Sequence, residues 1–251
     1  LSGLHAFAAP QFQSSTLERS AAAGNLSAAI AKPALSRSSL KDELPAGLNT
    51  REKLQFLSAR LDDRKFRLGA VHGDTMATLF NIVEIYEQAL EQDDDSVWRD
   101  LPAVDHLNIA LNLRLFGHLF MEADDLGSSH RLFSAVLTLT EHVLGSEHPD
   151  SALCLFDLAT LSGRRREFQL SEILYGKAIE IMEARLGAGH VYSAAAENNL
   201  AVAYHWQGKR EQAEPLYRRA LQIVLSKTRN DSPERQICMT NIGKLNEEHN
   251  R

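Results

Sequence analysis

Apolar residues recur at helical spacing along most of the chain after residue 50. Between residues 51 and 66, Leu54, Leu57 and Leu61 fall on one side of a helix. The pattern ends within about two heptads, which is too short for a coiled coil. It therefore predicts a short helix that docks on a neighbouring element.

Beyond residue 66 the apolar pattern repeats with a period of 42 residues. Sliding residues 144–185 onto residues 186–227 gives twelve identities, about four times the number expected from average residue usage. The unit recurs across residues 102–251, with a weaker, irregular relative at residues 68–101. The identical pairs are Leu144/Leu186, Gly145/Gly187, His148/His190, Ser151/Ser193, Ala152/Ala194, Leu158/Leu200, Ala159/Ala201, Glu172/Glu214, Leu174/Leu216, Tyr175/Tyr217, Ala178/Ala220 and Ile181/Ile223.

Each unit has the pattern of two helices joined by a turn, which in the copy at residues 186–227 contains Gly208. Small residues such as Ala201 and Ala220 let two antiparallel helices approach closely, and Tyr217 fills the space beside the crossing. Pro215 is expected in the first turn of the second helix, where its missing N–H costs nothing. One hairpin cannot bury its apolar side alone, so the copies should stack into a solenoid.

Three segments of the chain also resemble a known family. They are Leu-Gly-x-x-His-Pro-Asp at 144–150, Asn-Asn-Leu-Ala at 198–201, and Gln-Gly-Lys at 207–209 with Ala-Glu-Pro-Leu-Tyr-x-x-Ala-Leu-x-Ile at 213–223. In this order they resemble the 42-residue tetratricopeptide repeat of the kinesin light chain type. The resemblance implies an all-α, right-handed solenoid of three to four helical hairpins, firmly over 102–251 and loosely over 68–101.

The chain also departs from the family pattern. Phe156-Asp157 stand where the family often has paired asparagines, and Val191 replaces the proline after His190. No long heptad region precedes the repeats, which argues against an intact kinesin light chain.

Composition divides the chain into three regions. Residues 1–48 are rich in Ala and Ser and poor in acidic residues, which is typical of a disordered segment or part of an organellar transit peptide. Residues 49–101 should hold the docking helix and an irregular first helical unit, and residues 102–251 the repeats with a terminal capping helix. The location is thus cytoplasmic, or mitochondrial or plastid if residues 1–48 belong to a transit peptide.

Charge and cysteine content exclude several classes of protein. The 251 residues carry 27 Lys and Arg against 33 Asp and Glu, and a net charge of −6 disfavours nucleic-acid binding. No run of 18 apolar residues occurs, so no membrane span is expected. Cys154 and Cys238 lie two repeats apart, roughly 20 Å by helix packing distances, so they should stay reduced in a reducing compartment.

No residue pattern favours a cofactor, a metal or a catalytic centre. His148 and His190 occupy equivalent positions before a first helix, which indicates capping or packing. The run at 93–95 lacks the glycine and glutamate of a calcium loop, and Gly187-x-Gly189 lacks the third glycine and the strand of a phosphate loop. A non-enzyme is therefore expected, and a hydrolase or metal enzyme is kept as an alternative.

The resemblance also implies where a partner would bind. In tetratricopeptide stacks the first helices line the concave face, and side-chain amides there suit the backbone of an extended peptide. A protein or peptide partner is therefore expected. The family register gives the inward-facing positions as Arg114, His118, Asp157, Thr160, Arg164, Asn198, Asn199, Val202, His205, Trp206, Asn241 and Lys244.

Three alternatives stay open for these surfaces. The groove could be filled by the N-terminal segment of the chain itself, or its residues could be ordinary exposed helix positions. The protein could instead be a structural subunit or assembly factor of an organellar complex, held by its edges. Arg164-Arg165-Arg166 and Lys209-Arg210, in successive turns, form a basic edge that suits an acidic partner or simply a solvated surface.

Overall fold

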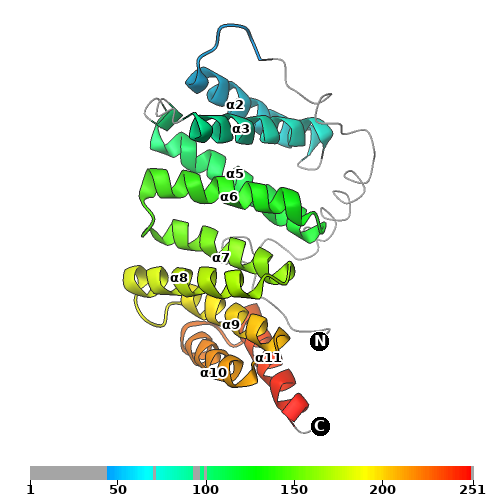
Figure 1. Cartoon of the computed structure of the whole chain (residues 1–251), viewed down its shortest axis with the longest axis vertical. Coiled ribbons are helices and arrows are strands. Elements are labelled where there is room, and N and C mark those ends of the chain that lie inside the picture. Colours follow the sequence, from blue (N-terminus) through cyan, green and yellow to red (C-terminus); the bar gives the residue numbers. More distant parts are fainter. Residues whose placement is uncertain (1–43, 70–71, 93–96, 99–100, 250–251) are drawn as a thin grey trace. The chain divides into compact units, whose positions relative to one another are not determined.

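The computed structural model describes residues 44–69, 72–92, 97–98 and 101–249, and all regular secondary structure in these ranges is helical (Figure 1). The chain forms two compact units, whose described parts are residues 44–143 and residues 144–249. The expectations for residues 1–43, of disorder or of a transit peptide, lie outside the described residues, as does the acidic run at 93–95.

The unit at residues 44–143 begins with the predicted docking helix. Helix α2 (Thr50–Leu68) starts in a capping box, in which Asn49 and Glu52 each accept the other's backbone N–H at 2.9 Å. Leu54, Leu57 and Leu61 are all buried, and α2 packs against α3 (Gly73–Glu91). A helix with these three leucines buried thus lies where the sequence predicts one.

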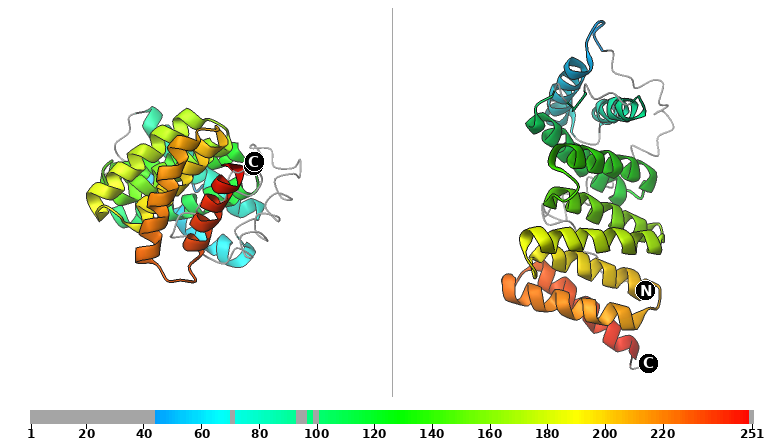
Figure 2. Two further views of the ribbon diagram at one scale, coloured as in Figure 1. Left: turned by 90° about the horizontal axis from the view of Figure 1, so that it is seen from below. Right: turned by 60° about the vertical axis from the view of Figure 1, so that its left-hand side comes forward.

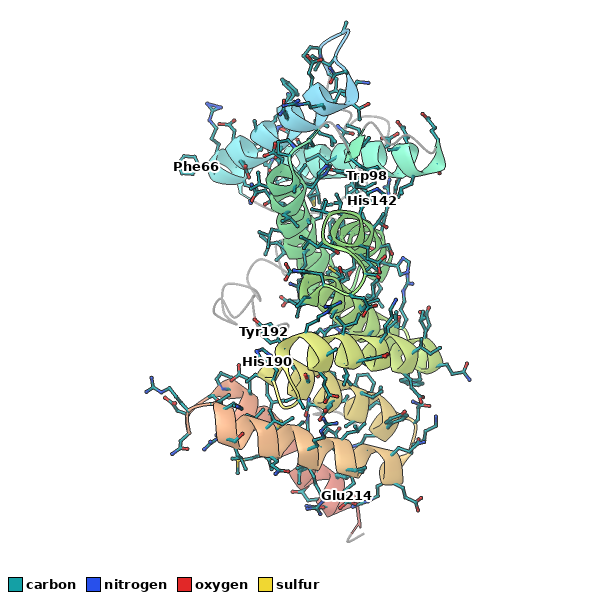
Figure 3. All side chains as sticks on the ribbon, turned by 90° about the vertical axis from the view of Figure 1, so that its left-hand side faces the viewer. Phe66, Trp98, His142, His190, Tyr192 and Glu214 are labelled. Carbon is teal, nitrogen blue, oxygen red and sulfur yellow. The ribbon has the colours of Figure 1, made fainter. Side chains whose placement is uncertain are left out.

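Helices α5 (Ala103–Glu122) and α6 (Leu126–Leu144) complete this unit. Arg131 of α6 forms a two-pronged ion pair with Glu87 of α3, with 2.6 Å between Arg131 Nε and Glu87 Oε1. The ring of Trp98 stacks on His142 at 4.1 Å between centroids, and Figure 3 labels both residues. Aromatic and ionic contacts therefore join helices that lie far apart in the sequence.

The unit at residues 144–249 contains two complete helical hairpins and one further helix. These are α7 (Pro149–Arg164) with α8 (Phe168–Leu186), α9 (Val191–Trp206) with α10 (Arg210–Lys227), and α11 (Pro233–His249). Helix α9 contacts α7 and α11 on its two sides as well as α8 and α10. Helices α7, α9 and α11 form the first-helix row of this unit, and α8 and α10 form its second-helix row (Figure 2).

The crossing of each hairpin is made of the small residues that the repeat predicts. Ala159 and Ala178 in the α7–α8 hairpin, and Ala201 and Ala220 in the α9–α10 hairpin, are completely buried. The hydroxyl of Ser171 on α8 donates to the carbonyl of Ala159 on α7 at 2.8 Å, a contact that only such a close approach allows. The prediction of closely packed hairpins is confirmed.

The expected place of Pro215 is wrong. Gly208, with φ at 74°, ends the turn early and α10 begins at Arg210, so Pro215 is the sixth residue of the helix. A proline there removes the intrahelical bond that an N–H would donate to the carbonyl of Glu211. The boundary of α8 agrees with expectation, because Leu186 ends the helix and Gly187 follows with φ at 93°.

Both cysteines are buried in the fold and carry free thiols. Burial, with Glu234 nearby, raises the pKa of the Cys238 thiol to about 12. The Cys154 thiol donates to the carbonyl of Asp150 at 3.1 Å. The Cys238 thiol therefore does not have the low pKa that thiol reactivity requires.

Within the described ranges, the helices are all too short or too polar to cross a membrane. The same ranges hold no group of three or more His, Cys, Asp or Glu side chains placed to bind a metal ion.

Candidate peptide-binding face on the first-helix row

Histidine side chains fix where the first helices begin. Nδ1 of His148 accepts the backbone N–H of Asp150 at 3.1 Å, and Nδ1 of His190 accepts that of Tyr192 at 3.2 Å. Each histidine is the N-cap of its helix, so the capping role expected from the repeat is confirmed. The His190 ring also meets the Tyr192 ring edge to face at 4.9 Å (Figure 3).

With the helix starts fixed at equal intervals, equivalent residues of the first-helix row fall into line. Asp157 on α7, Asn199 on α9 and Asn241 on α11 are 42 residues apart, and only 1%, 3% and 0% of their surfaces are exposed. None of the three lacks an interaction partner. A polar residue therefore recurs, buried, at one place in each first helix of the unit.

Two of these residues belong to a hydrogen-bonded amide cluster, which we define as Asn198, Asn199 and Asn241. Nδ2 of Asn241 donates to Oδ1 of Asn198 at 3.0 Å, which links α11 to α9. Nδ2 of Asn198 donates to Oδ1 of Asn199 at 3.2 Å, and Asn199 in turn hydrogen-bonds Tyr175 on α8. The Tyr175 hydroxyl lies 2.7 Å from that of Thr160 on α7. Side-chain hydrogen bonds thus connect the row from α7 to α11.

The remaining predicted groove residues differ widely in exposure. Val202 and His205 are buried on α9, and Thr160, Trp206 and Lys244 are half-buried. Arg164, at the end of α7, is exposed.

The two predicted residues in the other unit are buried on α5. His118 packs edge to face on the Phe133 ring at 5.0 Å, and Arg114 is 4% exposed. Of the twelve predicted positions, Arg164 is thus the one that is exposed in this structure. Contact of these residues with a partner stays a prediction.

The predicted basic edge lies in the turns of the two hairpins. Two of its cations have acidic neighbours. Nη1 of Arg165 lies 3.8 Å from Oε1 of Glu167, and Nζ of Lys209 lies 4.0 Å from Oε2 of Glu172. Lys209 also sits over the ring of Tyr204, whose hydroxyl donates to Glu172 at 2.5 Å. Part of the positive charge is thus already balanced within the edge.

One buried charged residue of α9 was not predicted as a site residue from the sequence. Glu197 lies on α9, and only 1% of its surface is exposed. Its Oε1 lies 3.2 Å from Nη1 of Arg219 on α10. Burial raises the pKa of Glu197 to about 7, Arg219 opposes the shift, and Glu183 on α8 adds to it. The signal was present in the sequence, because the equivalent positions one repeat away hold Leu155 and Met239.

Comparison with known proteins agrees with this architecture. A family model described as the tetratricopeptide repeat matches residues 192–251. This segment of the chain is thus similar to the tetratricopeptide repeat. The matched segment covers nearly all of α9 and the whole of α10 and α11, so it includes the crossing of the α9–α10 hairpin.

Solved structures resemble the fold of this chain over most of its length. BtubC (BKLC) from P. vanneervenii has a TM-score of 0.53 at 14% identity, over 81% of this chain and 85% of that one. A kinesin light chain of Podosopora anserina with nearly identical TPR-like repeats has a TM-score of 0.51 at 16% identity, over 81% and 89% of the two chains. At such identities the likeness shows the fold alone. No curated protein matches the sequence significantly.

Proposed function

We propose that this protein is a non-catalytic interaction scaffold that binds an extended peptide segment of a partner protein on its first-helix row. The tetratricopeptide repeat is a fold of protein interaction and not of catalysis, which supports the general role. The buried polar line of Asp157, Asn199 and Asn241 is the observation that carries the peptide hypothesis.

The helices of each hairpin are held together by apolar contacts. The alanine crossings and the buried tyrosines already supply the apolar contacts between the helices of a pair. Burying an amide stabilises nothing unless its donors and acceptors are matched. Asn199 and Asn241 are amides at repeat spacing, and Asp157 continues their line, so the row fits a ligand that itself repeats donors and acceptors, as an extended peptide backbone does.

The face is already covered in this structure, because every residue of α9 from Ser193 to His205 is buried. A peptide ligand must therefore displace existing contacts. The alternative in which the N-terminal segment of the chain fills this face falls on residues outside the described ranges, so a variant lacking residues 1–43 forms a second arm of the test.

Peptides selected from a displayed random library on the immobilised protein provide the probes for this test. The double change Asn198→Ala/Asn199→Ala should lower the affinity for these peptides at least tenfold, because each polar group left unmatched costs about 1–3 kcal/mol. The helical circular dichroism spectrum should not change. Tighter binding by the chain without residues 1–43 would show that the N-terminal segment competes for the same face.

The edge variant Arg165→Glu/Arg166→Glu is the matched control. It should retain the selected peptides and change mainly the salt dependence of association, because exposed charges act through screened attraction. The same variants are then compared in a pull-down from the native source. If the Asn198→Ala/Asn199→Ala variant keeps every partner and the edge variant loses them, the protein is a scaffold held by its edge.

A further inference from the structure

Aromatic side chains of three helices meet at Trp98, which lies between α3 and α5 in the unit at residues 44–143. The Trp98 ring stacks on His142 of α6, with 4.1 Å between the centroids and 21° between the planes (Figure 3). The same ring lies 5.5 Å from the ring of Tyr86 on α3 and 5.6 Å from the ring of His106 on α5. We call Tyr86, Trp98, His106 and His142 the Trp98 cluster.

Two members of the Trp98 cluster are titratable groups inside the fold. Only 1% of the surface of His106 and 2% of that of Tyr86 are exposed, whereas Trp98 is half-buried and His142 is exposed. The Tyr86 hydroxyl lies 2.9 Å from Nδ1 of His106. The buried pair thus links α3 to α5 through one hydrogen bond.

The direction of this hydrogen bond follows from what surrounds the hydroxyl. Burial, with Asp105 nearby, raises the pKa of Tyr86, so the hydroxyl keeps its proton. Within the described ranges this hydroxyl has no hydrogen-bond partner other than His106. A buried hydroxyl proton needs an acceptor, so Tyr86 donates and Nδ1 of a neutral imidazole accepts. The observed contact therefore requires that Nδ1 of His106 carries no proton.

A proton on His106 disturbs this arrangement in two ways. Both ring nitrogens of an imidazolium are donors, so the proton of the Tyr86 hydroxyl loses its acceptor. The added charge also lies in a site that water barely reaches, and burying an unsolvated charge is costly. Protonated His106 is therefore favoured only when the contact with Tyr86 opens.

The charged and polar groups around His106 do not remove this cost. Burial lowers the pKa of His106, and it is the largest influence on this group. Asp105 on α5 and the backbone of Trp98 and Val97 oppose the shift, while His142 on α6 adds to it. The net effect still favours the neutral ring.

We propose that the Trp98 cluster is a pH-sensitive joint that holds α3 and α5 together at neutral pH and opens on acidification. The closed joint binds a proton at His106 less tightly than the open joint does, so protons favour the open state. The joint is therefore most stable above pH 6.5, the ordinary pKa of histidine, and loses stability as the pH falls below it. The proposal is independent of peptide binding on the first-helix row.

His142 differs from His106 in what its protonation does. Because His142 is exposed, its imidazolium stays hydrated. A cation over the face of an indole ring is also attracted to it, so the stack on Trp98 is kept. Acid therefore separates Trp98 from Tyr86 and His106 and leaves it on α6.

Fluorescence of Trp98 in the full chain tests the proposal. The chain has two tryptophans, so the variant Trp206→Phe leaves Trp98 as its only indole. Between pH 8 and pH 5 the emission maximum should shift reversibly to longer wavelength, because the ring gains contact with water. The opening constant should rise by at most about tenfold per pH unit, because one proton is taken up. An emission maximum that stays constant over this range would overturn the proposal.

Two further variants in the Trp206→Phe background identify the sensor. His106→Gln keeps an acceptor for the Tyr86 hydroxyl but does not titrate, so its emission maximum should stay at the pH 8 value down to pH 5. The matched control is His142→Phe, which keeps an aromatic ring on Trp98 and should retain the shift. If His142→Phe loses the shift and His106→Gln keeps it, His142 is the sensor and the proposal is wrong.

Two measurements need no change at His106. In nitrogen-15 NMR spectra, His106 should have an unprotonated Nδ1 at pH 8, and it should take up its proton over the range in which Trp98 shifts. Hydrogen exchange, corrected for the intrinsic rates, should speed up in the first turns of α5 and not in α9 of the other unit. A Trp98 shift while His106 stays neutral would assign the opening to another group. Equal loss of protection in α5 and α9 would mean that acid unfolds the whole chain, which contradicts a local joint.

Discussion

The hairpins α7–α8 and α9–α10 are built on the same positions but differ on the first-helix row. They share Ala159/Ala201 and Ala178/Ala220 at the crossing and Tyr175/Tyr217 beside it, and all six residues are buried. Along their first helices, however, most positions differ, and the pairs that differ include Leu155/Glu197, Phe156/Asn198, Asp157/Asn199, Thr160/Val202, Gly163/His205 and Arg164/Trp206. The repeat thus conserves the contacts within a hairpin and leaves the face of the row free to vary.

The largest expected effect concerns the shared tyrosines. Tyr175→Ala and Tyr217→Ala should each lower the free energy of unfolding by about 3–5 kcal/mol, because a large buried ring leaves a cavity. Urea denaturation measures both values. The half-buried Tyr192→Ala serves as the control with a smaller loss. A difference of more than about 2 kcal/mol between Tyr175→Ala and Tyr217→Ala would show that the two hairpins are not equivalent.

The crossings come next. Ala159→Leu and Ala201→Leu should each destabilise the fold by about 1–3 kcal/mol, because the extra atoms overpack a site without free space. Thermal melting followed by far-UV circular dichroism detects the loss. Ala184→Leu, at an exposed position of α8, is the control, and its free energy of unfolding should stay within about 0.5 kcal/mol of the wild-type value. If Ala159→Leu and Ala201→Leu both melt at the wild-type temperature, these alanines do not lie at the helix crossings.

Glu197 tests a difference between the hairpins. Its pKa lies near 4.5 when unfolded and about 7 when folded, so the folded state holds the proton more tightly. The resulting stability is complete below pH 4.5 and falls as the pH rises through 7. Relative to Glu197→Gln, the free energy of unfolding of the wild type should therefore fall by roughly 2–3 kcal/mol between pH 5 and pH 8. Parallel stability curves for the two proteins over this range would contradict the raised pKa.

The smallest expected effect belongs to the caps that start both hairpins. His148→Ala and His190→Ala should each cost about 1 kcal/mol, because the N–H of residue 150 or 192 loses its acceptor. His190→Asn keeps an acceptor and should recover most of the loss in chemical denaturation. The exposed His130→Ala should have no effect. Equal stability of His190→Ala and His190→Asn would mean that the histidine acts by packing alone.

Features set by the repeat could be predicted from the sequence. The crossing alanines, the capping histidines and the glycine after α8 recur at an interval of 42 residues. Such recurrence indicates a structural role that a single occurrence would not. The docking helix was predictable from Leu54, Leu57 and Leu61 alone, because its apolar spacing is regular. The position of Pro215 was not, because a helix boundary depends on turn geometry that a period does not fix.

The candidate face was less predictable than the fold. The sequence pointed to the asparagines, but the depth of their burial and the link from Asn241 to Asn198 depend on tertiary contacts. Glu197 was missed because a single acid in an apolar position carries no periodic signal. Its only trace is the contrast with Leu155 and Met239.

Arg219 has a consequence for how the unit at residues 144–249 unfolds. It spans from α10 to Glu197 in its own hairpin and to Glu183 in the preceding one. In a repeat protein, cooperativity depends on the coupling between neighbouring repeats relative to the stability of each. A shared cation strengthens that coupling where α8 meets α9, so the two hairpins should open together and their backbone amides should exchange with solvent as one group. The same amides should exchange as two groups in Arg219→Leu.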